Sequence, residues 1–201
     1  MKIDKLWNGL KRIANGDYVL EGDLISEETI EIDLNDRFVV RGRIQTKKSI
    51  VVRCGIEAGD GIKAGCGIEA GCGIEAGEGI EAGCGIEAGW GIKAGWGIEA
   101  GDGIKAGCGI EAGEGIEAGD GIEAGEGIEA GDGIKAGEGI KAGEGIKAEK
   151  FIDVQKRIFA GISVYRTSRD CDKTIRCAEL RNGEICYGDL TLTKEGKPDE
   201  G

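Results

Sequence analysis

A six-residue unit, Gly-Ile-(Glu/Lys)-Ala-Gly-X, fills the middle of this 201-residue chain. Isoleucine recurs at every sixth position from Ile56 to Ile146 without a miss. A fixed period of this kind indicates a repeat architecture, in which each unit stacks on its neighbours and does not fold alone. Collagen would need Gly at every third position with abundant Pro, and the chain has 1 Pro. A strict isoleucine in every unit also argues against disorder.

The unit predicts a short strand followed by a corner. In Ile-Glu-Ala the side chains alternate, so Ile and Ala face one way and the charged residue faces the other. The Gly-X-Gly segment that follows can adopt turn conformations closed to other residues. We therefore expect an all-β fold, a β-solenoid with isoleucines stacked in its interior and coils hydrogen-bonded at a spacing of about 4.8 Å.

The six-residue period is compatible with two cross-sections, a three-sided prism and a flat two-sided ribbon. An 18-residue spacing aligns Cys54 with Cys72, Trp90 and Cys108, whereas a 12-residue spacing aligns Cys54 with Cys66. We favour three units per coil. The apolar frame continues at both ends of the perfect repeat, which predicts a solenoid over residues 32–164; the added positions are Ile32, Phe38, Ile44 and Ile50 upstream and Ile152, Ile158 and Val164 downstream.

The flanking segments are predicted to cap the solenoid, because a terminal coil exposes an open strand edge. Residues 1–31 would form an N-terminal cap with a short amphipathic helix over 4–14, started by Asp4 and ended by Gly16. Its apolar side would comprise Leu6, Trp7, Leu10, Ile13 and Ala14. Residues 165–201 would form a C-terminal cap and tail, with a β-hairpin turning at Asn182-Gly183 between 174–180 and 185–193. That hairpin could equally make a homodimer contact.

The charge of the chain is concentrated in the repeat. The formal net charge is −12, whereas residues 54–149 contain 20 acidic residues and 6 lysines. Such a surface should repel nucleic acid and membranes and attract basic proteins. No apolar segment resembling a signal peptide follows Met1, so we expect a cytoplasmic protein whose eight cysteines are mainly free thiols.

The six-residue period with an aliphatic first position, as at Ile56 and Ile62, resembles the hexapeptide-repeat family of left-handed β-helices. The resemblance covers about two-thirds of the chain. That family usually has a small residue at the fifth position of its unit, where this chain has Cys, Asp, Glu or Trp; here the small residue, Ala58, is at the third. The resemblance implies the solenoid fold, with handedness left open.

Enzymatic activity is not expected. Acyltransferases and carbonic anhydrases of the hexapeptide-repeat family use histidine, and this chain has none; a Ser-His or Cys-His nucleophile is equally excluded. Carboxylates in a repeat share one environment, so no acid/base pair is singled out. Cys171, Cys177 and Cys186 are interpreted as buried thiols of the cap rather than as zinc ligands. We expect no catalytic residue, no cofactor and no metal.

The X column holds the candidate site. Trp90 and Trp96 either fill a wider stretch of interior or form an exposed aromatic anchor for a partner. The second interpretation joins them to the neighbouring acidic run as a partner-binding surface, and its members are Trp90, Trp96, Asp102, Glu111, Glu114, Glu117, Asp120, Glu123, Glu126 and Glu129.

Two functions remain open. The first is an inhibitor or decoy that imitates nucleic acid and occupies a basic groove of a nucleic-acid-binding protein. In charge and shape the chain looks like acidic mimics on other solenoids, such as pentapeptide-repeat gyrase-protecting proteins, and like small phage-borne anti-CRISPR or anti-restriction inhibitors. The second is a structural rod that self-associates through its ends or joins a larger complex.

Overall fold

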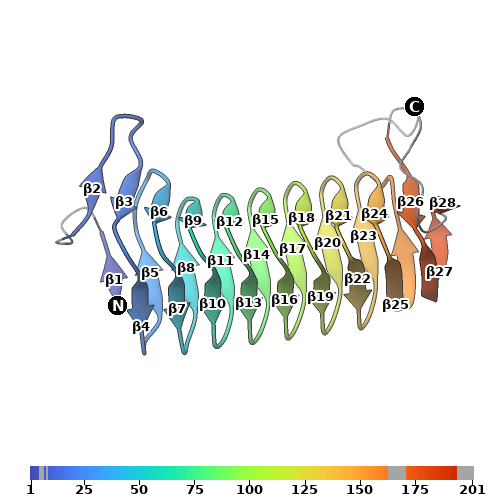
Figure 1. Ribbon diagram of the computed structural model, residues 1–201, viewed down its shortest axis with the longest axis horizontal. Helices are drawn as coiled ribbons and strands as arrows, with labels where there is room; N and C mark the ends of the chain where they lie inside the picture. Colours follow the sequence, from blue (N-terminus) through green and yellow to red (C-terminus); the bar gives the residue numbers. More distant parts are fainter. Residues whose placement is uncertain (5–6, 8, 163–170, 194–201) are drawn as a thin grey trace.

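The computed structural model describes residues 1–4, 7, 9–162 and 171–193, and it is an all-β solenoid of about nine coils (Figure 1). The described residues contain no helix. Short strands stack in three columns along a straight rod, with the N-terminus at one end and the C-terminal strands at the other. The predicted all-β solenoid is confirmed.

The three columns form the three faces of the rod. Face 1 consists of β2 (Lys11–Arg12), β3 (Tyr18–Leu20), β6 (Phe38–Val40), β9 (Ile56–Ala58), β12 (Ile74–Ala76), β15 (Ile92–Ala94), β18 (Ile110–Ala112), β21 (Ile128–Ala130), β24 (Ile146–Ala148), β26 (Thr174–Cys177) and β28 (Asp189–Leu192). Face 2 consists of β4 (Leu24–Ser26), β7 (Ile44–Thr46), β10 (Ile62–Ala64), β13 (Ile80–Ala82), β16 (Ile98–Ala100), β19 (Ile116–Ala118) and β22 (Gly133–Ala136). Face 3 consists of β1 (Lys2–Ile3), β5 (Ile30–Ile32), β8 (Ile50–Val52), β11 (Ile68–Ala70), β14 (Ile86–Ala88), β17 (Ile104–Ala106), β20 (Ile122–Ala124) and β23 (Ile140–Ala142). The long strands β25 (Phe151–Phe159) and β27 (Glu179–Tyr187) run around the corner between faces 2 and 3 and join them in one sheet.

The register of the repeat places every third unit on the same face. On face 1, for example, Ile74 pairs with Ile56 on one side and with Ile92 on the other, in parallel strands. The same spacing holds on faces 2 and 3 through the repeat. Three units therefore make one coil, as the favoured alignment of Cys54 with Cys72 predicted.

The core is a column of Ile and Ala side chains. Every isoleucine and alanine of the repeat is buried, while the Glu or Lys between them points outward. The alternation expected for Ile-Glu-Ala is confirmed. Thr46 takes an alanine position in an early coil, where its buried hydroxyl donates to the carbonyl of Glu28 (2.7 Å) and accepts from the backbone N–H of Lys48 (3.2 Å). A buried polar group is tolerated there because both its hydrogen-bonding capacities are used.

The corner glycines are required for a reason that differs from the expected one. No glycine of residues 54–149 has a φ in the left-handed region. Instead, the coils approach so closely that a Cβ at Gly107 would lie 2.0 Å from the carbonyl oxygen of Gly89. The other glycine of the same corner, Gly109, is less restricted, because its Cβ would lie 3.3 Å from the carbonyl oxygen of Gly127. Steric exclusion between coils, rather than turn conformation, keeps the first corner position free of side chains from Gly59 to Gly143.

The predicted helix over 4–14 is wrong for the residues that the structure describes there. β1 pairs in parallel with β5, and β2 and β3 form an antiparallel hairpin whose turn contains Gly16. Extended chain can hydrogen-bond to the open edge of the first coil, as when the N–H of Glu31 donates to the carbonyl of Met1. A helix cannot offer those partners, so the strand edge overrides a weak local helix preference. Leu6 lies outside the described residues.

The apolar frame also changes at the first coil. Ile30, not Ile32, stacks on Ile50, and Ile32 takes the position of the small inward residue over Val52. The earliest coil is longer than the coils of the repeat, as the pairing of Tyr18 with Phe38 shows. Leu34, which is buried, lies in the longer connection that follows Ile32.

The predicted C-terminal hairpin is wrong. β27 passes through Asn182 and Gly183 and pairs in parallel with β25, and β28 pairs in parallel with β26. Gly183 has a φ of +117°, so the Asn-Gly pair makes a corner inside a long strand instead of a chain reversal. The coil therefore continues to the last described strand. On face 1, Ile146 is followed by Ile175, and Val164 lies outside the described residues.

The two corner glycines give a matched test of the close approach between coils. Gly107→Ala should destabilise the rod by more than about 2 kcal/mol, because its Cβ meets backbone that cannot move without disturbing the ladder. Gly109→Ala should change stability by less than about 1 kcal/mol, since its contact is tight but tolerable and alanine restricts the unfolded chain. Urea unfolding followed by circular dichroism measures both. Equal losses from the two variants would contradict the steric explanation.

Candidate interaction surface

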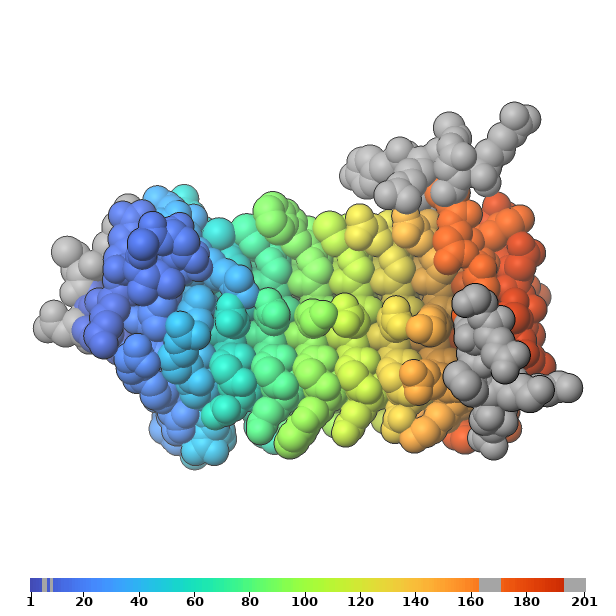
Figure 2. Space-filling model, turned by 45° about the horizontal axis from the view of Figure 1, so that its top comes forward, coloured from blue at the N-terminus to red at the C-terminus, as the bar shows by residue number. Residues whose placement is uncertain are grey.

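The X residues point outward from the corners and form three rows along the rod. Figure 2 shows that outward side chains repeat in parallel lines along the rod. Row 1 precedes face 1 and contains Cys54, Cys72, Trp90, Cys108, Glu126 and Glu144. Row 2 precedes face 2 and contains Asp60, Glu78, Trp96, Glu114, Asp132 and Lys150. Row 3 precedes face 3 and contains Cys66, Cys84, Asp102, Asp120, Glu138 and Lys156.

The two tryptophans of the repeat are exposed. Trp90 is 65% exposed and Trp96 is 55% exposed. They lie on different rows and flank a single strand of face 1, β15, which runs between them. The interpretation of these rings as interior filler is wrong, because only Ile and Ala of the repeat enter the core.

The outward strand residues form ladders of ion pairs. Each of the six repeat lysines contacts a glutamate one coil away on the same face; the pairs are Lys63–Glu81, Lys93–Glu111, Lys105–Glu87, Lys135–Glu117, Lys141–Glu123 and Lys147–Glu129. Near the N-terminal end, Arg37 contacts both Glu57 and Glu75. The Glu111 carboxylate raises the pKa of Lys93, first by hydrogen bonding and then by its charge. Charge on the faces is thus largely compensated.

The surplus negative charge lies at the corners. Most acidic X residues have no salt bridge among the described residues; these are Asp60, Glu78, Asp102, Glu114, Asp120 and Glu126. Among the glutamates on the faces, only Glu69 and Glu99 have no salt bridge within the described part of the repeat. The coil formed by residues 110–127 contains six acidic residues and no lysine or arginine, so it forms an acidic belt around the rod.

The predicted partner-binding residues do not form one patch. Residues 111 and 129 are one coil apart, so the acidic run between them passes once around all three faces. The structure brings six of the ten together on face 1 and its two bordering rows: Trp90, Trp96, Glu111, Glu114, Glu126 and Glu129. Glu117 lies on face 2, Glu123 on face 3, and Asp102 and Asp120 in row 3.

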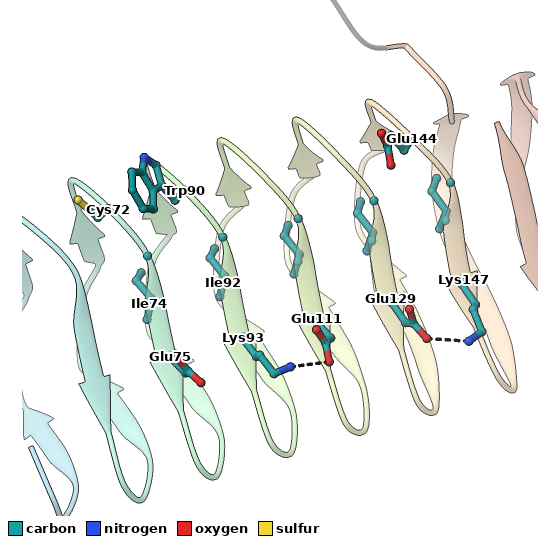
Figure 3. A pocket seen from close by; sticks show the side chains of 18 of the residues that line it. Cys72, Ile74, Glu75, Trp90, Ile92, Lys93, Glu111, Glu129, Glu144 and Lys147 are labelled. Carbon is teal, nitrogen blue, oxygen red and sulfur yellow. Dashed lines mark hydrogen bonds and ion pairs between the residues drawn. The ribbon is translucent and has the colours of Figure 1, made fainter. Parts of the chain in front are cut away.

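A groove of about 870 Å³ runs along face 1 between row 1 and the outward strand residues (Figure 3). Its floor is Gly-Ile backbone from successive coils, and Trp90 forms part of one wall while Lys93, Glu111, Glu129 and Lys147 form the other. Arginines lie at its two ends, Arg37 and Arg176. The 18-residue alignment placed Cys54, Cys72 and Cys108 in one row with Trp90. Sequence reasoning missed the lysines and arginines beside Trp90, although aligning the charged positions of every third unit would have placed the lysines.

The remaining cysteines differ from one another. Cys177 is fully buried in the core, and this burial raises the pKa of its thiol, whereas Cys171 is half-buried and Cys186 is exposed. The interpretation as buried thiols is therefore right for Cys177 and wrong for Cys186. Within the described residues, no group of three or more Cys, Asp or Glu side chains is arranged to hold a metal ion. The same part of the chain has no helix with the length and hydropathy needed to span a bilayer.

Comparison with known proteins gives no relative: no protein-family model, no curated protein and no solved structure matches this chain. Its function must therefore be inferred from the geometry and charge of the rod itself.

Glu99 offers a test of the ladder electrostatics, because it lies in register between Glu81 and Glu117. Glu99→Lys should stabilise the rod by about 0.5–1 kcal/mol by converting two repulsive neighbours into attractive ones, and the gain should shrink in high salt. The same change at Glu111, which already contacts Lys93, should give no gain. Thermal unfolding at low and high ionic strength measures both variants; a gain at Glu111 equal to that at Glu99 would contradict the ladder assignment.

Proposed function

We propose that this protein is a non-enzymatic acidic decoy, which imitates nucleic acid and occupies the basic groove of a nucleic-acid-binding protein, in the manner of anti-CRISPR or anti-restriction inhibitors. The observation that carries this proposal is the linear density of negative charge along the rod. Its partner would be a basic protein, and neither nucleic acid nor a membrane would bind directly.

The charge density is close to that of a DNA duplex. Residues 54–149 contain 20 acidic residues and 6 lysines, and they make about five coils, which at ~4.8 Å per coil extend over roughly 26 Å. The rod therefore has about one net negative charge per 1.8 Å, whereas duplex DNA has one per ~1.7 Å of its axis. A groove selected for the DNA backbone would meet a similar field on this rod.

The distribution of charge adds to this support. Carboxylates without salt bridges lie in rows at the corners, where a concave partner would reach them first. The ion-paired faces between the rows keep the coil stack from excessive repulsion. Trp90 and Trp96 lie one or two coils from the acidic belt, and exposed aromatic rings next to charged groups are frequent anchors at protein interfaces.

The test is competition for basic proteins. A panel of nucleic-acid-binding proteins is loaded with a fluorescent duplex of about 20 base pairs, and displacement by the rod is followed by anisotropy between about 50 and 300 mM salt. The proposal requires displacement from at least one member, with an affinity that falls steeply as salt rises. Failure to displace the duplex from any member, or an affinity independent of salt, would exclude the decoy function.

Two matched variants separate the charge rows from the tryptophans. Glu114→Gln with Asp120→Asn and Glu126→Gln removes three corner charges of the acidic belt and should weaken binding at least tenfold at low salt while reducing the salt dependence. Trp90→Ala with Trp96→Ala should weaken binding without changing the salt dependence, because no charge is lost. A triple variant that has full affinity would show that the belt does not contact the partner.

A scaffold rod is the second candidate, and the C-terminal end favours it. β27 and β28 have no strand on their outer side among the described residues, and Tyr187, Leu190 and Leu192 are exposed there. At the other end β1 covers the first coil on face 3 and β2 covers it on face 1. A two-fold dimer through the exposed C-terminal coil fits this arrangement. Light scattering that shows a monomer up to about 100 µM would count against this candidate.

A further inference from the structure

The cysteines of the repeat follow a pattern that neither the core nor the charge rows explain. Five of the sixteen units have Cys at X, all within residues 54–108. Four of these five form two pairs at a spacing of three units, Cys54 with Cys72 in row 1 and Cys66 with Cys84 in row 3. Because three units make one coil, each pair lies at the same corner of neighbouring coils.

The sulfur atoms of the first pair are in contact but not bonded. The Sγ atoms of Cys54 and Cys72 are 3.3 Å apart, and the N–H of Cys72 donates to the carbonyl of Cys54 (3.1 Å). The second pair has the same backbone arrangement, since the N–H of Cys84 donates to the carbonyl of Cys66 (3.2 Å). Stacked residues of adjacent coils are about 4.8 Å apart, which lies inside the ~4.4–6.8 Å range of Cα separations in disulfides.

Their surroundings leave these thiols reachable from solvent. Cys66 and Cys84 are exposed, and Cys54 and Cys72 are half-buried. The hydrogen bond with Cys54, followed by partial burial, raises the pKa of the Cys72 thiol. Partial desolvation, followed by the charge of the nearby Asp102 carboxylate, raises the pKa of the Cys84 thiol. A raised pKa lowers the thiolate fraction of Cys72 and Cys84 and so slows their exchange, while an oxidant can still approach both pairs from solvent.

We infer that Cys54–Cys72 and Cys66–Cys84 are two reversible disulfide sites, which close between adjacent coils when the protein meets a low-molecular-weight disulfide such as oxidised glutathione. This inference does not depend on the proposed decoy function.

The reaction is a double thiol–disulfide exchange. One thiol of a pair loses its proton, and the thiolate attacks the small disulfide, which forms a mixed disulfide and releases one small thiolate. The second thiol of the pair then loses its proton and attacks the protein sulfur of the mixed disulfide, which forms the intrachain S–S bond and releases the other small thiolate. The two protein thiols supply two electrons and two protons, and the oxidant leaves as two thiols.

Cys108 is a built-in control. It lies in row 1 like Cys54 and Cys72, but its neighbours in that row are Trp90 and Glu126. The closest cysteine of its row, Cys72, is two coils away, about 9.6 Å, which exceeds the reach of a disulfide. Cys108 should therefore stop at the mixed disulfide with the small thiol.

The experiment treats the full-length protein with oxidised glutathione, caps the remaining thiols with iodoacetamide, and digests without reduction. Cleavage after glutamate separates the four paired cysteines, because Glu57, Glu69, Glu75 and Glu81 lie between them in sequence. Mass spectrometry should find the peptide of Cys54 joined to that of Cys72 and the peptide of Cys66 joined to that of Cys84, with glutathione on Cys108. Mixed disulfides on the paired cysteines, or unmodified paired cysteines beside a modified Cys108, would overturn the inference.

Thermal stability gives a second readout. Each closure restricts a loop of one coil, so each disulfide formed should raise Tm by roughly 6–12 °C. Cys54→Ser combined with Cys66→Ser should abolish this rise, while Cys108→Ser should leave it unchanged. These variants should fold, because the same outward rows accept Asp, Glu and Trp in other coils. A rise that persists in the double variant would assign the effect to other cysteines and contradict the inference.

Discussion

Backbone hydrogen bonds between residues one coil apart hold each coil on the next, and this register determines the rest of the rod. It brings isoleucine over isoleucine and alanine over alanine, so a core forms although the chain has few aromatic residues. It also brings the corners of neighbouring coils so close that a Cβ at the first corner position would clash with backbone from Gly59 to Gly143. The same register converts every third unit into a column, so that a substitution in one unit is felt by the units stacked above and below it rather than by its neighbours in sequence.

The repeat made the central fold predictable, whereas the ends were not. The period of six, with Ile and Ala on one side of each strand, was sufficient to predict coils, and aligned cysteines favoured three units in each. Residues 4–14 have a helical spacing of apolar side chains, but the open edge of the first coil pairs with extended chain, and local spacing contains no information about that edge. Asn182-Gly183 has the composition of a hairpin turn, yet Ile158 and Val154 of the preceding coil lie against Gly183 and keep the chain on its path around the core.

The candidate site could also be predicted only in part from the sequence. Trp90 and Trp96 were identified from composition, and their exposure follows from the fact that the core of the repeat accepts only Ile and Ala. The acidic positions were also identified, but their neighbours are set by the length of a full coil, which a linear scan does not display. Lys93 and Glu111 are far apart in sequence and form an ion pair, while Glu111 and Glu117 are close in sequence and lie on different faces. Charge compensation on the faces and charge surplus at the corners are therefore properties of the folded coil.

The three-unit coil also restricts how such a gene can change in length. Loss or gain of three units leaves every later residue in its own row, and the rod only becomes shorter or longer by one coil. Loss of a single unit would rotate all the residues that follow by one face, so that lysines would face new partners and the tryptophans would change their alignment with the cysteines. Replication slippage in a repetitive gene of this kind should consequently be tolerated when it adds or removes whole coils, and selected against when it adds or removes single units.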